Sequence, residues 1–191
     1  MTMFSENKTA QMAGYLLLKR GGRMAYIKLM KLLYLADREY MISYGDSMTG
    51  DRAVSMNNGP VLSRTYDLLK SGSPEEESPW DDWISGESNY EVSIKKHVHG
   101  VDEEEAFDEL SRADKRILDR VFEQFGHYKR FELCDLTHQI CPEWQDPHGS
   151  SVPISPKSIF MAGGKSEEEA NIILDRMRER ELLKQFSSEL A

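Results

Sequence analysis

The clearest pattern along the chain is an apolar stripe between Met24 and Tyr44. Apolar and aromatic residues recur there at intervals of three and four: Tyr26, Leu29, Leu33, Ala36 and Tyr40. This spacing predicts an amphipathic helix. Gly45-Asp46 follows and predicts its end. We expect this to be the central helix of the fold, with Leu33 in the core.

Shorter patterns predict helices on both sides of it. Caps and closing glycines mark several of their ends, including a capping box at Ser111-x-x-Asp114 and another at Ser166-x-x-Glu169. The predicted ranges are Thr9 to Lys19 with Thr9 as the cap, Val61 to Leu69, Ser111 to Gly126, Phe131 to Ile140, Ser155 to Met161, and Ser166 to about Phe186.

Extended segments are fewer. Thr49 to Met56 favours a short strand, and Tyr90, Val92 and Ile94 alternate with polar residues, as in a half-buried strand. Residues 71–88 predict a loop, with two tryptophans, Trp80 and Trp83, as anchors to the core. The pattern therefore predicts an α+β fold that is predominantly α-helical: a single globular domain with a small antiparallel β-sheet or hairpin.

The stretch SMNNGPVLSRTY, residues 55–66, predicts a rigid corner. Asn57-Asn58-Gly59 tolerates positive φ, and Pro60 fixes φ at a value with which a helix can start. One interpretation is purely architectural: the corner sets the angle between an extended segment and a helix. The other is that it presents the backbone of residues 49–58 to a partner, for example by strand pairing.

The composition indicates one soluble domain of 191 residues. No apolar run is long enough to span a membrane, and the N-terminus does not have the pattern of a signal peptide. Two cysteines in a chain without such a signal favour reduced thiols and a cytoplasmic location.

The net charge of −9 is unevenly distributed. Residues 1–40 carry +4, whereas residues 67–110 carry −11. The acidic stretch is typical of a solvated loop region, and the alternative is a surface for a basic partner. The net negative charge of the chain argues against nucleic-acid binding, because it repels the phosphates of the nucleic acid.

Few residues indicate chemistry. Cys134 and His138 lie four apart on a predicted helix, with Cys141 beyond it, which suggests either a zinc site or a thiol nucleophile. Neither cysteine belongs to a C-x-x-C pair, and His97-x-His99 has no further ligands nearby. We therefore assign no catalytic residue, no metal ligand and no cofactor.

Taken in order, several motifs resemble the SocA-like, or Panacea-domain, antitoxin family. They are the helix KLMKLLY at residues 28–34, YG at 44–45, GPV at 59–61 with Tyr66, FGH at 125–127, LCDLTH at 133–138, PEW at 142–144 and SVPIS at 151–155. The resemblance covers roughly residues 12–165. We expect a Panacea domain over residues 1–165, with a C-terminal helix in 166–191 packed on it.

The resemblance implies an antitoxin that binds and neutralises a toxin encoded beside it, and not an enzyme. A ClpXP-type protease and a second copy of the chain are further candidate partners, and a membrane is not one. The alternatives are a protease adaptor, a phage-encoded regulator of a host protein, or a hydrolase that uses Cys134, His138 and Cys141.

The predicted toxin surface surrounds the corner and the polar side of helix 24–44. The other hypothesis is that the charged residues of this set pair with one another and brace the corner. We expect Leu33, Tyr66 and Trp144 to be structural. The predicted partner-binding residues are Asp37, Arg38, Asp51, Arg52, Asn57, Gly59, Pro60 and Arg64.

Overall fold

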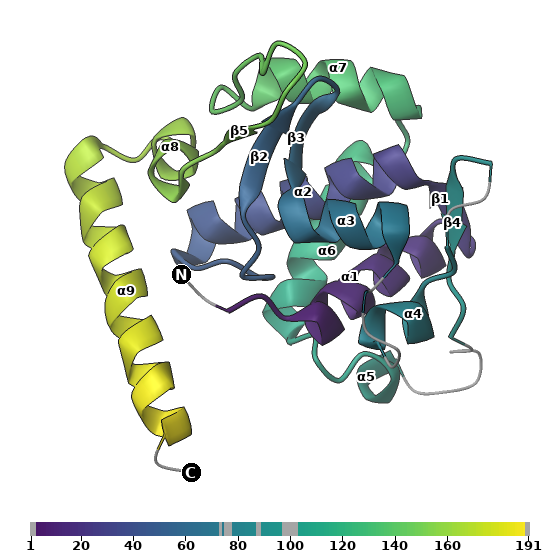
Figure 1. Ribbon diagram of the computed structural model, residues 1–191, viewed down its shortest axis with the longest axis horizontal. Coiled ribbons are helices and arrows are strands. Elements are labelled where there is room, and N and C mark those ends of the chain that lie inside the picture. Colours follow the sequence, from purple (N-terminus) through teal and green to yellow (C-terminus); the bar gives the residue numbers. More distant parts are fainter. Residues whose placement is uncertain (1–2, 73, 75–77, 87–88, 97–102, 190–191) are drawn as a thin grey trace.

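The computed structural model describes residues 3–72, 74, 78–86, 89–96 and 103–189. It has the predicted α+β fold, mostly helical with small antiparallel sheets (Figure 1). The elements in chain order are α1 Glu6–Lys19, β1 Arg23–Ala25, α2 Tyr26–Tyr44, β2 Ala53–Met56, β3 Gly59–Leu62, α3 Ser63–Ser71, α4 Pro79–Trp83, β4 Glu91–Ser93, α5 Glu103–Ala106, α6 Arg112–Phe125, α7 Arg130–Ile140, β5 Val152–Pro153, α8 Pro156–Ala162 and α9 Glu167–Glu189.

Helix α2 is the centre of the molecule, as the apolar stripe predicts. It contacts α1, α3, α6, α7, α8 and strand β3, so residues 27 to 37 are all buried. A helix buried on every side needs apolar residues around most of its circumference. Leu33 has no exposed surface.

A β-hairpin lies against this helix. Strand β2 pairs with β3 in antiparallel register, from Ala53 opposite Leu62 to Met56 opposite Gly59, and β5 pairs with the other edge of β2. A separate two-stranded sheet joins β1 to β4. In Figure 1 the hairpin extends past α2 toward α7.

The predicted corner is a hairpin turn and not the start of a helix. The positive φ falls on Gly59, at +96°, and not on either asparagine. Pro60 lies within β3, and the helix that we expected from Val61 begins at Ser63. Strand β3 is an edge strand, where a proline can leave its missing N–H on the side away from the neighbouring strand.

The local helix signals of the C-terminal half are confirmed. Ser111 and Asp114 form the capping box of α6, and Ser155 caps α8 ahead of Pro156. Ser166 and Glu169 exchange the equivalent bonds at the start of α9. The predicted Thr9 cap is wrong: α1 begins at Glu6 and is capped by Ser5.

The stretch expected as a loop contains the short helix α4. Trp80 and Trp83 lie on it, and each is only 2% exposed, so both anchor this segment to the core. The predicted strand from Tyr90 to Ile94 is shorter than expected. Val92 is buried, but Tyr90 is 63% exposed and lies before the strand.

The last helix packs over only part of its length. Ala170 and Met177 are buried, whereas Leu182, Leu183 and Phe186 are 54–66% exposed. Figure 1 shows α9 along one side of the molecule, with its last turns far from the hairpin. None of the helices in the described part of the chain is both long and apolar enough to cross a membrane.

Candidate partner-binding surface

Several polar side chains of α2 point into the protein and bind segments outside the helix. Lys28 is 6% exposed, and its Nζ donates to the carbonyl oxygens of Gly126 at 2.5 Å and Tyr128 at 2.8 Å. Burial, and then the charge of Arg20, lower the pKa of Lys28. This lysine attaches the turn between α6 and α7 to the central helix.

Lys31 attaches the hairpin. Its Nζ donates to the carbonyl oxygen of Pro60 at 2.8 Å, and the side chain has no exposed surface. Burial lowers the pKa of Lys31 to about 8. A Cβ at Gly59 would lie 2.6 Å from Thr137 Oγ1 and 3.2 Å from Lys31 Nζ. Glycine therefore lets the hairpin approach both α2 and α7 at this point.

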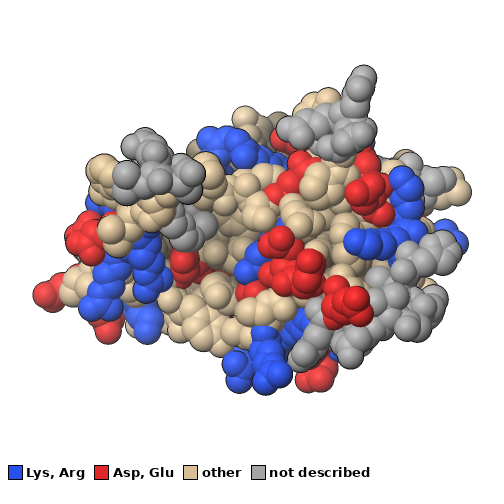
Figure 2. All heavy atoms as spheres, turned by 90° about the horizontal axis from the view of Figure 1, so that it is seen from below, with Lys and Arg blue, Asp and Glu red and all other residues tan. Residues whose placement is uncertain are grey.

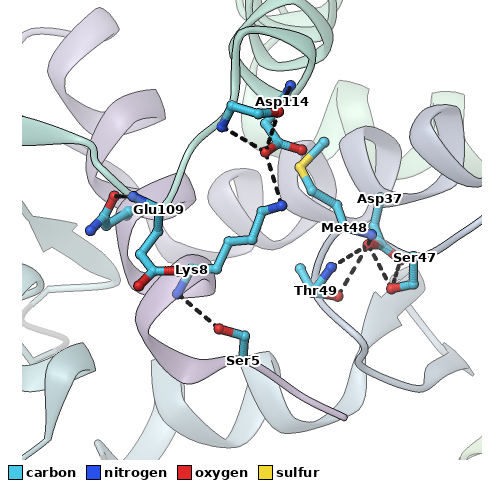
Figure 3. Close-up of polar contacts among 10 residues, drawn as sticks. Ser5, Lys8, Asp37, Ser47, Met48, Thr49, Glu109 and Asp114 are labelled. Atoms are coloured by element: carbon cyan, nitrogen blue, oxygen red, sulfur yellow. Dashed lines mark hydrogen bonds and ion pairs between the residues drawn. The ribbon is translucent and has the colours of Figure 1, made fainter. Parts of the chain in front are cut away.

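Asp37 holds the loop that follows α2 (Figure 3). Its Oδ1 accepts the backbone N–H groups of Met48 at 2.8 Å and Thr49 at 2.9 Å, and the hydroxyls of Ser47 and Thr49 also donate to the carboxylate. Asp37 is buried, and burial raises its pKa to about 6 despite these hydrogen bonds.

Tyr34 and Arg38 bind Glu143, in the segment between α7 and β5. The Tyr34 hydroxyl and Arg38 Nε each donate to Glu143 Oε1 at 2.6 Å, and Arg38 Nη2 lies 3.3 Å from Oε2. The Glu143 side chain is 0% exposed. Burial, and then the Glu143 charge, raise the pKa of Tyr34. A buried carboxylate with three donors is well satisfied.

Trp144 continues this link to the hairpin. Its Nε1 donates to the carbonyl oxygen of Met56 at 3.0 Å, and its ring stacks on His138 with centroids 4.1 Å apart. The next residue, Gln145, donates its N–H to Ser55 Oγ at 3.1 Å. The hairpin is therefore held by α2 from one side and by residues 144–145 from another.

Asp51 caps helix α3 from outside that helix. Leu62 occupies the N-cap position and has no side-chain acceptor. Instead, Asp51 accepts the N–H groups of Arg64 at 3.0 Å and Thr65 at 2.8 Å, together with the Thr65 hydroxyl at 2.8 Å. The carboxylate satisfies the free N–H groups of the first turn and opposes the helix dipole favourably.

A cleft of about 220 Å³ opens beside the hairpin tip. The exposed residues at its mouth are Asn57, Asn58, Gly149 and Ser150, and its base is formed by buried side chains that include Met30, Lys31 and Val61. Its lining residues are Tyr26, Ile27, Met30, Lys31, Met56, Asn57, Asn58, Gly59, Val61, Tyr66, Gly149 and Ser150.

A comparison with protein families decides the affiliation of the chain. Residues 29–145 match the model of the family described as antitoxin SocA-like, Panacea domain. The chain belongs to this family. Among curated proteins and among solved structures, no match was found.

The matched segment of the Panacea domain is shorter than the region of resemblance inferred from the motifs. It begins inside α2 and ends at Gln145, so it contains the residues to which Lys31, Asp37 and Arg38 bind. Helices α1, α8 and α9 lie outside it. Most of the sequence motifs therefore meet at α2, and several of their polar residues serve to hold the domain together.

The predicted partner-binding residues of this Panacea domain divide into two groups. Arg52 and Arg64 are exposed beside the base of the hairpin, and Asn57 is exposed at its tip. The other predicted residues are withdrawn from solvent: Asp37, Asp51, Gly59 and Pro60 are buried, and Arg38 is partly buried. Asp37 and Asp51 brace backbone N–H groups, and Arg38 binds Glu143, so these residues do not pair with one another as the brace hypothesis supposed.

Sequence reasoning missed Lys31 and Glu143 as functional parts of this architecture. Lys31 lies within the KLMKLLY motif and Glu143 within the PEW motif, and the motifs alone assigned neither residue a role. The alternative acidic surface within residues 67–110 is described in part: Glu105, Asp108 and Glu109 are exposed. Residues 75–77 and the pair His97 and His99 lie outside the described residues.

The Cys134, His138 and Cys141 group lacks the properties of a thiol nucleophile. Both thiols are free and buried. Burial raises the pKa of Cys134, and burial followed by the Glu143 charge raises that of Cys141 to about 12. A nucleophilic cysteine needs a lowered pKa. In the described part of the chain, no three His, Cys, Asp or Glu side chains come together as metal ligands.

Proposed function

We propose that this Panacea-domain protein is the antitoxin of a toxin–antitoxin pair and neutralises its toxin by direct binding. The observation that carries the proposal is the match of residues 29–145 to the SocA-like antitoxin family. The raised pKa values of the two thiols weigh against the hydrolase hypothesis at that position.

The proposed binding surface is the exposed side of the hairpin and the start of α3. Arg52 and Arg64 are neighbours, because Ser63 donates its N–H to the carbonyl oxygen of Arg52. Arginine favours interfaces, since its planar guanidinium can form two hydrogen bonds with one carboxylate. Asn57 extends the surface to the turn, where its Oδ1 accepts the N–H of Gly149 at 3.2 Å.

The buried residues near this surface give it a fixed shape. Lys31 holds the outer edge of the hairpin, Trp144 holds its tip, and Asp51 holds the start of α3. A surface that is already ordered loses less conformational entropy on binding. Asp37 and Arg38 belong to this support, and we do not propose them as direct contacts.

Co-expression with the product of the adjacent gene tests the proposed function. That product should stop growth when expressed alone, and growth should return when this protein is co-expressed. The two chains should also purify together. An adjacent gene product that is harmless alone, or that remains toxic beside a well-expressed and folded copy of this protein, would overturn the proposal.

A further inference from the structure

In the part of the chain that the structure describes, the buried cation Lys31 has no buried carboxylate beside it. Among the described residues, its one hydrogen-bond acceptor is the carbonyl oxygen of Pro60, although an ammonium group has three N–H donors. The titratable groups that act on its pKa are the thiols of Cys134 and Cys141, whose own pKa values are raised. An ammonium group that has lost its water without gaining an ion pair is costly.

This lysine lies at the base of the cleft beside the hairpin tip. Apolar side chains surround it there: Ile27, Met30, Met56 and Val61. At the mouth are the amides of Asn57 and Asn58 and the hydroxyl of Ser150. A second ammonium group, that of Lys70, lies 4.4 Å from the ring centroid of Tyr26, which also lines the cleft.

From this arrangement we infer that the cleft binds a peptide carboxylate next to an apolar side chain, with the carboxylate placed toward Lys31. Lys31 has no exposed surface in the unbound protein, so the carboxylate reaches its Nζ when the flexible side chains of Met30 and Met56 at the base of the cleft move aside. The carboxylate then supplies the charge that the ammonium lacks and accepts charge-assisted hydrogen bonds. The apolar walls take the side chain beside it. The cleft is smaller than the usual pocket for a drug-sized ligand, so it has room for about one residue.

The carboxylate has two sources in a protein partner: the C-terminus or an acidic side chain. The identity of that partner as the toxin rests on the proposed function, but binding in the cleft does not. Peptides alone can therefore test the inference. The probes are acetyl-Gly-Phe with a free carboxylate, the same peptide as its carboxamide, and acetyl-Glu-Phe carboxamide, which carries only a side-chain carboxylate.

The measurement is a peptide titration followed by the methyl NMR signals of Met30, Met56 and Val61. We expect saturable shifts with at least one carboxylate peptide, and binding of the Gly-Phe carboxamide weaker by about tenfold or more. Stronger binding of acetyl-Gly-Phe would assign the site to a C-terminus, and stronger binding of the Glu peptide to an acidic side chain. No saturable shift, or equal binding of acids and amide, would overturn the inference.

Two variant pairs locate the binding. Ser150→Trp should block the mouth and weaken carboxylate binding by about tenfold or more, whereas the exposed neighbour Ser151, which does not line the cleft, should tolerate tryptophan. Lys31→Met should abolish the preference for carboxylate over amide, whereas Lys28→Met, which removes another buried lysine of α2, should keep it. If Lys31→Met does not fold, the comparison of the tryptophan variants at Ser150 and Ser151 still tests the inference. Equal binding of the carboxylate peptide by these two variants would contradict it.

The cleft and the proposed function can fail separately. If co-expression does not restore growth but the carboxylate peptides bind as expected, the antitoxin proposal falls and the cleft site stands. If growth is restored but the peptides do not bind, the cleft inference alone is wrong.

Discussion

Helices α2 and α9 both mix charged and apolar residues, but they use their charges in opposite ways. In α2 the side chains of Lys28, Lys31 and Asp37 are at most 6% exposed, and each binds a backbone segment that is distant in sequence or follows the helix. In α9 most charged residues face solvent. Figure 2 shows Lys and Arg side chains gathered on the side where α9 lies in Figure 1.

This difference shows that composition does not say whether a charge supports the fold or lies at the surface. What decides is whether another segment brings a partner to the charge. The matched family segment supplies such partners to α2, for example the Pro60 carbonyl and Glu143. Helix α9 lies outside that segment, and its Leu182, Leu183 and Phe186 remain exposed.

The largest effect is expected from Glu143→Ala. Removal of this carboxylate leaves the Arg38 guanidinium and the Tyr34 hydroxyl without their acceptor, and loss of one partner from a buried ion pair costs about 3–5 kcal/mol. Urea unfolding measures this loss. The matched control is Glu179→Ala on α9, which should change the free energy of unfolding by less than about 0.5 kcal/mol. Similar losses in the free energy of unfolding for the two variants would contradict the difference between the buried charges bound to α2 and the exposed charges of α9.

Asp37→Asn should change the pH dependence of stability. The folded protein holds the Asp37 proton up to a pKa of about 6, above the ordinary aspartate value of 3.8. The folded state therefore binds more protons between these values, and this residue makes stability fall as the pH rises from about 4 to 6, by about 3 kcal/mol in total. The asparagine variant should lack this component. Parallel stability curves for the two proteins over that pH range would contradict the assignment.

A smaller loss is expected from Trp144→Ala. The variant loses the bond to Met56, the stacking on His138 and part of the packing, with a cost of about 1–3 kcal/mol. The melting temperature should fall by about 2–4 °C for each kcal/mol. Trp144→Phe is the control that keeps an aromatic ring and should lose less. A melting temperature unchanged by alanine, together with weaker toxin binding, would place Trp144 in the interface instead.

The smallest change is expected when the chain is ended after Met177. This truncation removes two ion pairs between exposed or partly exposed side chains: Arg180 Nη1 with Asp46 Oδ2 at 3.7 Å, and Arg178 Nη1 with Asp175 Oδ1 at 3.0 Å. Exposed ion pairs contribute about 0–1 kcal/mol. The shortened protein should melt cooperatively within a few degrees of the full chain. Unfolding of the domain would show that the second half of α9 is part of its structure.

Local signals in the sequence predicted much of the fold. The apolar stripe of α2 depends only on residues close together in the sequence, and so do the helix caps at Ser111, Ser155 and Ser166. The sequence alone can therefore predict these features. The hairpin was harder to predict. Pro60 is compatible with both a helix start and an edge strand, and the choice depends on contacts with α2 and α7.

The candidate site was predictable only in part. The exposed arginines Arg52 and Arg64 could be proposed from their position beside the corner. The burial of Lys31 and Asp37 could not, because the spacing that predicts a helix does not reveal how many sides will be covered. The partners of Tyr34 and Arg38 lie more than 100 residues away along the chain, and no local pattern links them.

The most direct test of the account is the affinity of the toxin for the double variant Arg52→Glu, Arg64→Glu. Arg116→Glu, an exposed change on α6, serves as the control. We expect both proteins to melt within a few degrees of the unchanged protein. The double variant should bind the toxin about 30-fold more weakly, the effect of a hot spot worth about 2 kcal/mol, whereas the control should bind normally. Full affinity and full restoration of growth by the double variant would contradict the proposed surface.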